Sequence, residues 1–438
     1  MEFYTTNEKE QWVSHTNEPG EVNTTLFMTE ENEELWEGFG GCFNELSKKA
    51  IDALPSGQQH LYDALFSPEA DGLRLEFCRL PIGASDYAES WYSHNENDGD
   101  YEMEKFSIAR DRRYLIPYIQ EARKRNPRLR LFASPWSPPV WMKTHRAYNF
   151  GTLIWDEPTR KAYALYLLKF VQAYEREGIA IDQLHVQNEP MSTQKFPSCI
   201  WTGPQFAEFI GRYLGPLFEE NHMRTKIWLG TLNGPETDGR ALHTRYNDYA
   251  NYVLHDPDAY RYIEGVSYQW AGKYAVQITK NSFPEKKILQ SENECGDGEN
   301  TWAYANYIFE LFHHYITNGV CAYVYWNMVL PPKGESTWGW RQNSMATVEN
   351  GSVHFQYEYY VMKHFSHFVH MGARRIGLAG HFSGNSVAFK TPEGHVALIC
   401  QNPFDRVITF DWYGSPIGLP PRSINTVYWT NPFPGHDA

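Results

Sequence analysis

The sequence lacks a long apolar run, a paired cysteine motif and an excess of positive charge. Its densest apolar stretch, Tyr163–Val171, is interrupted by Lys169 and is shorter than the roughly 20 residues that a membrane-spanning helix needs. Asp and Glu (53) outnumber Lys and Arg (39), which gives a formal net charge of −14. Because nucleic acids and anionic membranes attract basic surfaces, we expect no nucleic-acid partner and no integral membrane association.

Cysteine and histidine are present without the spacings that bind metals or form disulfide frameworks. The 6 cysteines include no C-x-x-C pair, and the 17 histidines include no H-E-x-x-H motif. We therefore expect free, buried thiols, no metal site and no cofactor. The N-terminal segment MEFYTTNEKEQW lacks the basic and apolar regions of a secretory signal, so we expect a cytoplasmic protein.

Eight apolar segments of strand length follow one another after residue 35. They are Gly38–Phe43, Leu73–Arg79, Leu129–Ala133, Gln183–Gln187, Lys226–Gly230, Gly265–Gln269, Lys287–Ser291 and Cys321–Trp326. Helical spacing of apolar residues occurs between several of them, in Phe106–Lys124, Glu157–Glu177, Gly203–Asn221 and Trp302–Asn318. Strands that alternate with helices form parallel sheets, and eight such units predict an α/β fold of the (β/α)8, or TIM, barrel type.

Both ends of the chain consist of short strand-like segments separated by turns. Near the C-terminus, the turns fall at residues 392–394 and 402–403, between segments of alternating apolar residues. This pattern is typical of antiparallel sheets. We predict that both chain termini form an appended antiparallel β-sandwich, with residues 1–35 as its N-terminal strands, 36–375 as the catalytic barrel, and 376–438 as its C-terminal part.

Two glutamates follow barrel strands four and seven, where this fold places catalytic groups. Glu189 lies in the segment Gln187–Pro190, and Glu292 directly follows strand seven. Either glutamate alone is as often a surface or capping residue as a catalytic one, but the pair is typical of glycoside hydrolysis by two carboxylates. Pro190 predicts an extended backbone for Glu189, and Asn188 beside it offers a hydrogen-bond donor and acceptor to a sugar hydroxyl.

The segment after Glu292 is acidic, and several loops after barrel strands are rich in tryptophan. Glu294 has the same strand parity as Glu292, and Asp297 and Glu299 follow, but the spacing does not match a calcium loop. Aromatic rings offer flat apolar faces on which sugar rings stack. The aromatic candidates for the pocket lining are Trp136, Trp141, Tyr268, Trp270, Trp326, Trp338 and Trp340.

These motifs together resemble glycoside hydrolase family 30, and most closely its glucosylceramidase branch. The resemblance rests on the segments GFGGCFNEL, RLPIGASDYA, LFASPWSPPVWMKT, HVQNEP, LQSENECG and LPPRSINTVYW, which occur in this order. It covers nearly the whole chain. It implies a retaining mechanism in which Glu189 is the acid/base and Glu292 is the nucleophile.

The resemblance also implies roles for the residues around the two glutamates. Arg79 would support the nucleophile, Asn188 would bind the 2-hydroxyl, and Asp86 and Trp136 would hold the outer hydroxyls of the terminal sugar. Trp326 would form a platform on strand eight. Tyr268 is aligned with a family histidine, although the segment SYQWAG departs from the family pattern there, and SENEC is one residue longer before its cysteine.

We therefore predict a retaining, exo-acting β-glycosidase that hydrolyses terminal β-glucosyl residues of small-molecule or oligosaccharide substrates. The resemblance leaves β-xylosidase and β-1,6-glucanase activity open, and the departures from the family pattern argue against ceramide as the natural aglycone. Endo-action on a polysaccharide is a further alternative, and a non-catalytic carbohydrate-binding barrel is a remote one. No sequence feature decides between a monomer and a homodimer.

Overall fold

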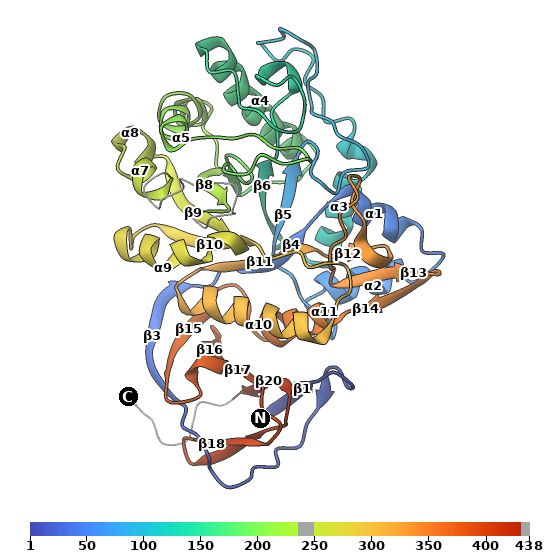
Figure 1. Ribbon diagram of the computed structural model, residues 1–438, viewed down its shortest axis with the longest axis vertical. Coiled ribbons are helices and arrows are strands. Elements are labelled where there is room, and N and C mark those ends of the chain that lie inside the picture. The colour runs from blue at the N-terminus through green and yellow to red at the C-terminus, as the bar shows by residue number, and fades with distance from the viewer. Residues whose placement is uncertain (235–248, 431–438) are drawn as a thin grey trace.

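The computed structural model describes residues 1–234 and 249–430 and contains a closed eight-stranded parallel barrel (Figure 1). The barrel strands in chain order are β4 (Gly38–Cys42), β5 (Phe77–Ile82), β6 (Arg130–Pro135), β7 (Gln183–His185), β8 (Lys226–Leu232), β9 (Ile263–Gln269), β10 (Lys287–Glu292) and β11 (Ala322–Asn327). The barrel closes where β11 pairs with β4. Each strand overlaps one of the eight predicted segments, so the predicted barrel is confirmed.

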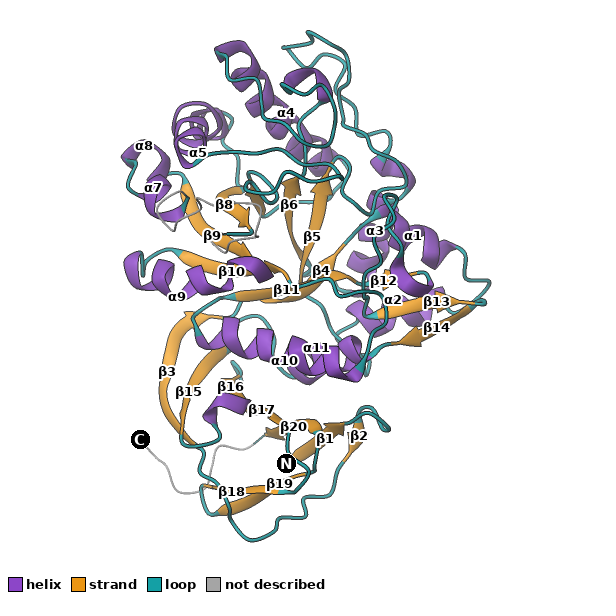
Figure 2. Cartoon of the chain, in the orientation of Figure 1, coloured by secondary structure: helices purple, strands orange, loops and turns teal. Residues whose placement is uncertain are grey.

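Helices surround the barrel, as Figure 2 shows. They are α1 (Glu45–Asp52), α2 (Gln58–Phe66), α3 (Leu115–Arg125), α4 (Glu157–Arg176), α5 (Gly203–Phe209), α6 (Gly215–Glu220), α7 (Ala250–Leu254), α8 (Pro257–Tyr260), α9 (Lys273–Ser282), α10 (Trp302–Thr317) and α11 (Tyr357–Ser366). A π-helical turn, Ile210–Leu214, joins α5 to α6 and makes one continuous helical segment, as predicted. The helix predicted from Phe106 is wrong in its first part, because α3 begins only at Leu115.

The two chain termini meet in an antiparallel sheet on one side of the barrel (Figure 1). Its order is β2-β1-β20-β17-β16-β15-β3. These strands are β1 (Glu2–Thr6), β2 (Val13–Ser14), β3 (Phe27–Leu35), β15 (Arg374–Ala379), β16 (Ser386–Lys390), β17 (Val396–Asn402) and β20 (Ser423–Trp429). All five residues of β1 pair with β20, which confirms that both termini build this unit. The final residues 431–438 of the predicted C-terminal part lie outside the described residues.

A second, two-stranded sheet packs against this terminal sheet and completes the sandwich. It consists of β18 (Ile408–Trp412) and β19 (Ser415–Leu419). Its buried side chains share one apolar core with residues of the larger sheet, such as Phe3 and Leu398. Burying apolar surface contributes about 25 cal/mol of stabilising free energy per Å², and this contribution holds the two sheets together.

Side chains fill the lower part of the barrel and support the site above them. Phe77, Phe132, Trp228 and Leu289 belong to one fully buried cluster contributed by different barrel strands. A barrel of this kind is a packed core rather than a pore, so its open end lies at the carboxyl ends of the strands. A small sheet of β12 (Val329–Leu330), β13 (Ala346–Glu349) and β14 (Ser352–Phe355) follows β11. No helix within residues 1–234 and 249–430 has the length and apolar character needed to cross a membrane.

Candidate active site

A cavity of about 310 Å³ lies at the carboxyl ends of the barrel strands and contains both predicted catalytic glutamates. Its lining comprises Asp86, Trp136, Glu189, Ser192, Gln194, Phe196, Asn233, Trp270, Ala271, Glu292, Glu294, Cys295, Gly296, Trp340 and Gln342. A larger cavity, about 1060 Å³, lies between α10 and the terminal sheets and contains none of the predicted site residues. Volume therefore does not identify the site, and the convergence of carboxylates does.

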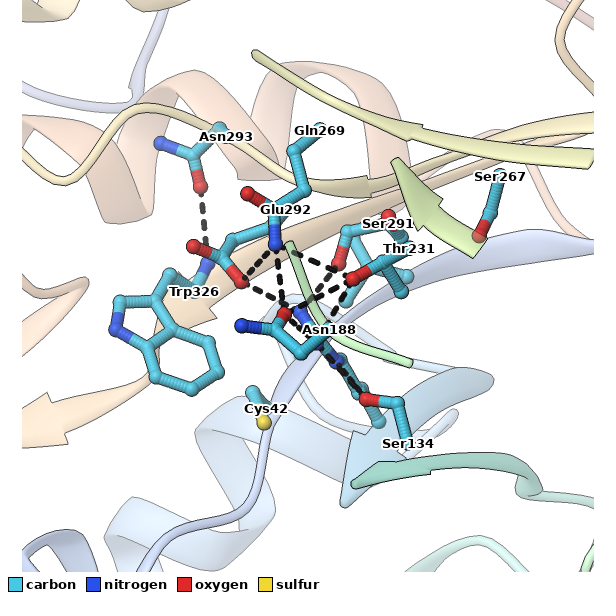
Figure 3. Close-up of polar contacts among 12 residues, drawn as sticks. Cys42, Ser134, Asn188, Thr231, Ser267, Gln269, Ser291, Glu292, Asn293 and Trp326 are labelled. Carbon is cyan, nitrogen blue, oxygen red and sulfur yellow. Dashed lines mark hydrogen bonds and ion pairs between the residues drawn. The ribbon is translucent and has the colours of Figure 1, made fainter. Parts of the chain in front are cut away.

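Glu292 is the last residue of β10 and is buried at the bottom of this cavity. Its Oε2 atom accepts a hydrogen bond from Arg79 Nη1 at 2.5 Å. It accepts a second one from Gln269 Nε2 at 3.0 Å, which Figure 3 shows. Burial raises the pKa of Glu292, and the adjacent Arg79 guanidinium opposes that rise. The arrangement fixes Oε2 against the protein, whereas Oε1 has a long contact of 4.0 Å with Cys295 Sγ and is the oxygen that a substrate can meet.

Arg79 is fully buried, and each of its polar groups has a partner. Besides Glu292, it donates to Ser134 Oγ at 2.8 and 3.0 Å and to Asn188 Oδ1 at 2.6 Å. Its guanidinium carbon lies 4.4 Å from the ring centroid of Trp136 and 5.5 Å from that of Trp326. Arginine suits this position because its planar fork can bond to three groups while it stacks on aromatic faces.

Asn188 has an amide orientation that the surrounding donors determine. Its Oδ1 accepts hydrogen bonds from Arg79 Nη2 (2.6 Å), Gln269 Nε2 (2.8 Å) and Thr231 Oγ1 (2.9 Å). The amide nitrogen therefore points away from these donors, as Figure 3 shows. An N–H donor fixed in this way can bind a sugar hydroxyl without reorganising, which fits the predicted role of Asn188.

Glu189 lies beyond the end of β7 and adopts a left-handed backbone conformation, with φ of 46°. The extended conformation predicted from Pro190 is therefore wrong. A following proline disfavours the right-handed helical region, and that does not force an extended backbone. Two hydrogen bonds hold the turn: Glu189 N–H donates to the Thr231 carbonyl at 3.0 Å, and Ser192 N–H donates to the Glu189 carbonyl at 2.9 Å. Strained backbone of this kind is common at functional sites.

Asp86 and Gln342 form another part of the cavity lining. Burial, reinforced by the negative charge of Glu292, raises the pKa of Asp86 to about 7. Gln342 Nε2 donates to Asp86 Oδ2 at 3.4 Å, and Gln342 Oε1 accepts from Asn327 Nδ2 at 2.8 Å. Asp86 was predicted as a sugar-binding residue, whereas Gln342 was not singled out because it lies in an irregular segment without a motif.

Tyr268 does not face the cavity, so the prediction that it binds substrate is corrected. Its hydroxyl group lies 2.7 Å from Thr279 Oγ1 of α9, and its ring is part of the main apolar core. Successive strand residues point to opposite sides, so the next residue, Gln269, reaches Glu292 instead. The alternation of β9 was visible in the sequence and would have identified Gln269.

The aromatic candidates divide into cavity residues and core residues. Trp136, Trp270 and Trp340 line the cavity, and Trp340 is 40% exposed. Trp326 is buried and is not part of the lining, but its ring centroid lies 5.4 Å from that of Trp136. Trp141 is buried, and its indole N–H donates to the Asn95 carbonyl; Trp338 packs against Phe196.

The acidic segment after β10 forms a wall of the cavity. Glu294, Cys295 and Gly296 all line it. Within the described parts of the chain, no three His, Cys, Asp or Glu side chains converge as a metal site would require. Five of the six cysteines are buried free thiols, and Cys295 is partly exposed, which departs from the expectation that all six are buried.

Comparisons with known proteins agree with this geometry. The model of the glycosyl hydrolase family 30 TIM-barrel domain matches residues 36–369. Lysosomal acid glucosylceramidase of Mus musculus is 26% identical over 446 residues, which cover 93% of this chain and 84% of that protein. An endo-1,6-β-D-glucanase of Trichoderma harzianum is 25% identical over 429 residues, covering 90% and 84% of the two chains.

A solved structure of an endo-β1,6-glucanase has the same fold. It superposes with a TM-score of 0.84 at 23% identity and covers 98% of this chain and 99% of that one. The family model spans the whole barrel, including both cavity glutamates and Arg79. The chain therefore belongs to glycosyl hydrolase family 30 and is a glycoside hydrolase.

Proposed function

We propose that this glycoside hydrolase is a retaining, exo-acting β-glucosidase with Glu292 as nucleophile and Glu189 as acid/base. The observation that carries the proposal is the placement of Glu292, which Arg79 and Gln269 orient at the bottom of a cavity that Glu189 also lines. A nucleophile must be ionised and fixed in direction, and the guanidinium favours both.

The proposed reaction has two steps. Glu292 Oε1 attacks the anomeric carbon while Glu189 donates a proton to the departing glycosidic oxygen, which forms a covalent glycosyl-enzyme. Glu189, now a carboxylate, then removes a proton from a water molecule that attacks the same carbon and releases Glu292. Asn188 would bind the 2-hydroxyl, where a hydrogen bond strengthens in the oxocarbenium-like transition state.

The size and polarity of the cavity support exo-action on a small terminal sugar. A volume of about 310 Å³ is at the lower end of the range for small-molecule sites, roughly 300–1,000 Å³. Asp86 and Gln342 offer polar groups to outer hydroxyls, and Trp136 offers an aromatic face. The small volume and the polar lining are both features of a pocket that ends at the terminal sugar.

The catalytic roles are tested with an activated aryl β-glucoside. Glu292→Gln should lose nearly all turnover, and near wild-type turnover would refute the nucleophile assignment. Glu189→Ala should regain activity when azide is added, because azide can attack the glycosyl-enzyme without a general base, and the product should be the β-glycosyl azide. An absence of rescue would contradict the acid/base role.

Endo-acting β-1,6-glucanase is the second candidate, because a relative with that name aligns over 90% of this chain. Product analysis on β-1,6-linked glucose oligomers separates the two: glucose alone as the first product indicates exo-action, whereas larger oligomers indicate endo-action. A parallel panel of aryl β-glucoside, β-xyloside, β-fucoside and β-galactoside identifies the sugar. Glucose and xylose differ by one CH2OH group, which a single side chain can exclude.

A further inference from the structure

The segment that follows Glu292, residues 293–300, is held from behind by two buried residues outside the cavity. We call this segment the nucleophile loop. It connects the end of β10 to α10 and supplies Glu294, Cys295 and Gly296 to the cavity wall. The residues behind it are Asn343, which precedes β13, and Glu358, which lies in the first turn of α11.

Asn343 binds the nucleophile loop at several points along its length. Its backbone N–H donates to the Cys295 carbonyl at 2.7 Å, and its side-chain Oδ1 accepts from the backbone N–H groups of Gly298 (2.8 Å) and Asn300 (3.4 Å). A further hydrogen bond joins the two segments, because the Asn300 side-chain oxygen accepts from the Ser344 backbone N–H at 3.1 Å. One buried amide thus satisfies loop donors that would otherwise be orphaned away from water.

The loop closes tightly around this amide. Gly296 has φ of 69°, and a Cβ atom there would lie 2.6 Å from Asn343 Cγ. Only glycine combines this backbone conformation with so close an approach. Any larger side chain at position 296 would therefore collide with the Asn343 amide.

Glu358 completes the hydrogen bonding of the Asn343 amide. The backbone N–H groups of Gly298 and Asn300 require the amide oxygen to face them, and Asn343 Nδ2 then donates to Glu358 Oε1 at 2.7 Å. In the reverse orientation the NH2 group would meet two N–H donors. Glu358 is fully buried, and its Oε1 is the acceptor that keeps the buried Asn343 Nδ2 donor paired.

The surroundings of Glu358 favour a neutral carboxylic acid. The ionisable groups that act on it are Asp297 from the nucleophile loop, Tyr304 from α10 and Tyr325 from β11, and no Lys or Arg in residues 1–234 and 249–430 forms an ion pair with it. Burial, reinforced by Asp297, raises the pKa of Glu358 to about 8.

We propose that Asn343 and Glu358 are positioning residues that fix the nucleophile loop, and through it the direction of Glu292 and the wall of the cavity, without touching substrate. The expected loss of kcat in the variants rests on the proposed role of Glu292. The expected pH dependence of their stability does not, so the two can be tested separately.

The kinetic test compares Glu358→Gln with Glu358→Leu on an aryl β-glucoside. Glutamine keeps an Oε1 acceptor for Asn343 Nδ2, so kcat should stay within about threefold of wild type; leucine removes it, so kcat should fall about tenfold or more with a smaller change in KM. Asn343→Ala should lower kcat similarly, and adding it to Glu358→Leu should lower kcat little further, because the two act as one unit. Equal losses for Gln and Leu, or wild-type kcat in a folded Leu variant, would overturn the proposal.

The second test uses stability and applies even if the leucine variant fails to fold. A carboxyl whose pKa is higher in the folded state binds its proton more tightly there, so its contribution to stability is present at low pH and is lost as pH rises toward about 8. The melting temperature of Glu358→Gln, relative to wild type, should therefore rise between about pH 5 and pH 8 and then level off. The control is Glu349→Gln at an exposed position of β13, which should show no such trend.

The stability test and the test of the catalytic glutamates fail in different ways. A difference between Glu358→Gln and wild type that stays constant with pH would refute the neutral buried acid, and the kinetic comparison of the Gln and Leu variants tests the positioning role. An active Glu292→Gln variant would instead refute the catalytic assignment and leave the stability result unaffected.

Discussion

The ion pair between Arg79 and Glu292 makes a quantitative prediction about stability. Both side chains are buried, and removing one partner of such a pair leaves an uncompensated charge that costs about 3–5 kcal/mol. Arg79→Met does this to Glu292 and also removes donors from Ser134 and Asn188. Glu292→Gln should cost less, because Arg79 keeps those two acceptors. The double variant removes both charges, so we expect it to be at least about 1.5 kcal/mol more stable than the sum of the single effects predicts.

The measurement is a double-mutant cycle followed by thermal unfolding at neutral pH. An unfolding entropy of roughly 2.1 cal/mol/K per residue gives roughly 0.9 kcal/mol/K for 438 residues, so Arg79→Met should lower Tm by about 3–6 °C if the chain unfolds as one unit. Arg422→Met, which breaks an exposed pair with Asp405, is the matched surface control and should leave Tm nearly unchanged. Additivity of the Arg79 and Glu292 effects within about 0.5 kcal/mol would refute the coupling.

Three further predictions follow from the site and from the joined termini. The pKa of Asp86 is raised to about 7, so the stability that its protonated form contributes is lost as pH rises toward 7. The Tm of Asp86→Asn relative to wild type should therefore increase between about pH 4 and pH 7. A difference in Tm that does not change with pH would contradict the raised pKa. Gln269→Leu should lower kcat/KM about tenfold or more, because it removes a hydrogen-bond donor to Glu292. Tyr268→Phe should keep its activity and lose only about 1 kcal/mol of stability. A larger loss of kcat/KM in Tyr268→Phe than in Gln269→Leu would restore Tyr268 as a site residue. Deleting residues 1–6 removes β1 from its pairing with β20 and should lower Tm, as measured by circular dichroism, and an unchanged Tm would show that β1 does not stabilise the sandwich.

Several parts of the site could be predicted from the sequence because they follow from strand order. In a parallel barrel every strand ends at the same face, so residues directly after apolar segments converge whatever their separation along the chain. Glu292 at the end of β10 and Asn188 after β7 illustrate this, because both share hydrogen bonds with Arg79 of β5. The family resemblance added the roles, and the family comparison confirmed the family.

Other parts depended on local geometry that the motifs did not reveal. The resemblance favoured Tyr268 over its neighbour, but the alternation of β9 directs Gln269 to Glu292. Pro190 suggested an extended Glu189, whereas hydrogen bonds in the turn hold it at a positive φ. In both cases the motif identified the right segment of the chain. The direction of each side chain depended on strand alternation or on hydrogen bonds within the turn.

The periodicity and order of the apolar segments predicted the fold class, the joining of the termini and the convergence of the two glutamates. Folding brings Gln342 beside Asp86 in the cavity lining and places Asn343 and Glu358 behind the nucleophile loop. These residues come from irregular segments and a helix after the last barrel strand, and no periodic pattern relates them to Glu292. Their partners are selected by packing and by the need to satisfy buried polar groups, which are properties of the folded chain and not of any segment of it.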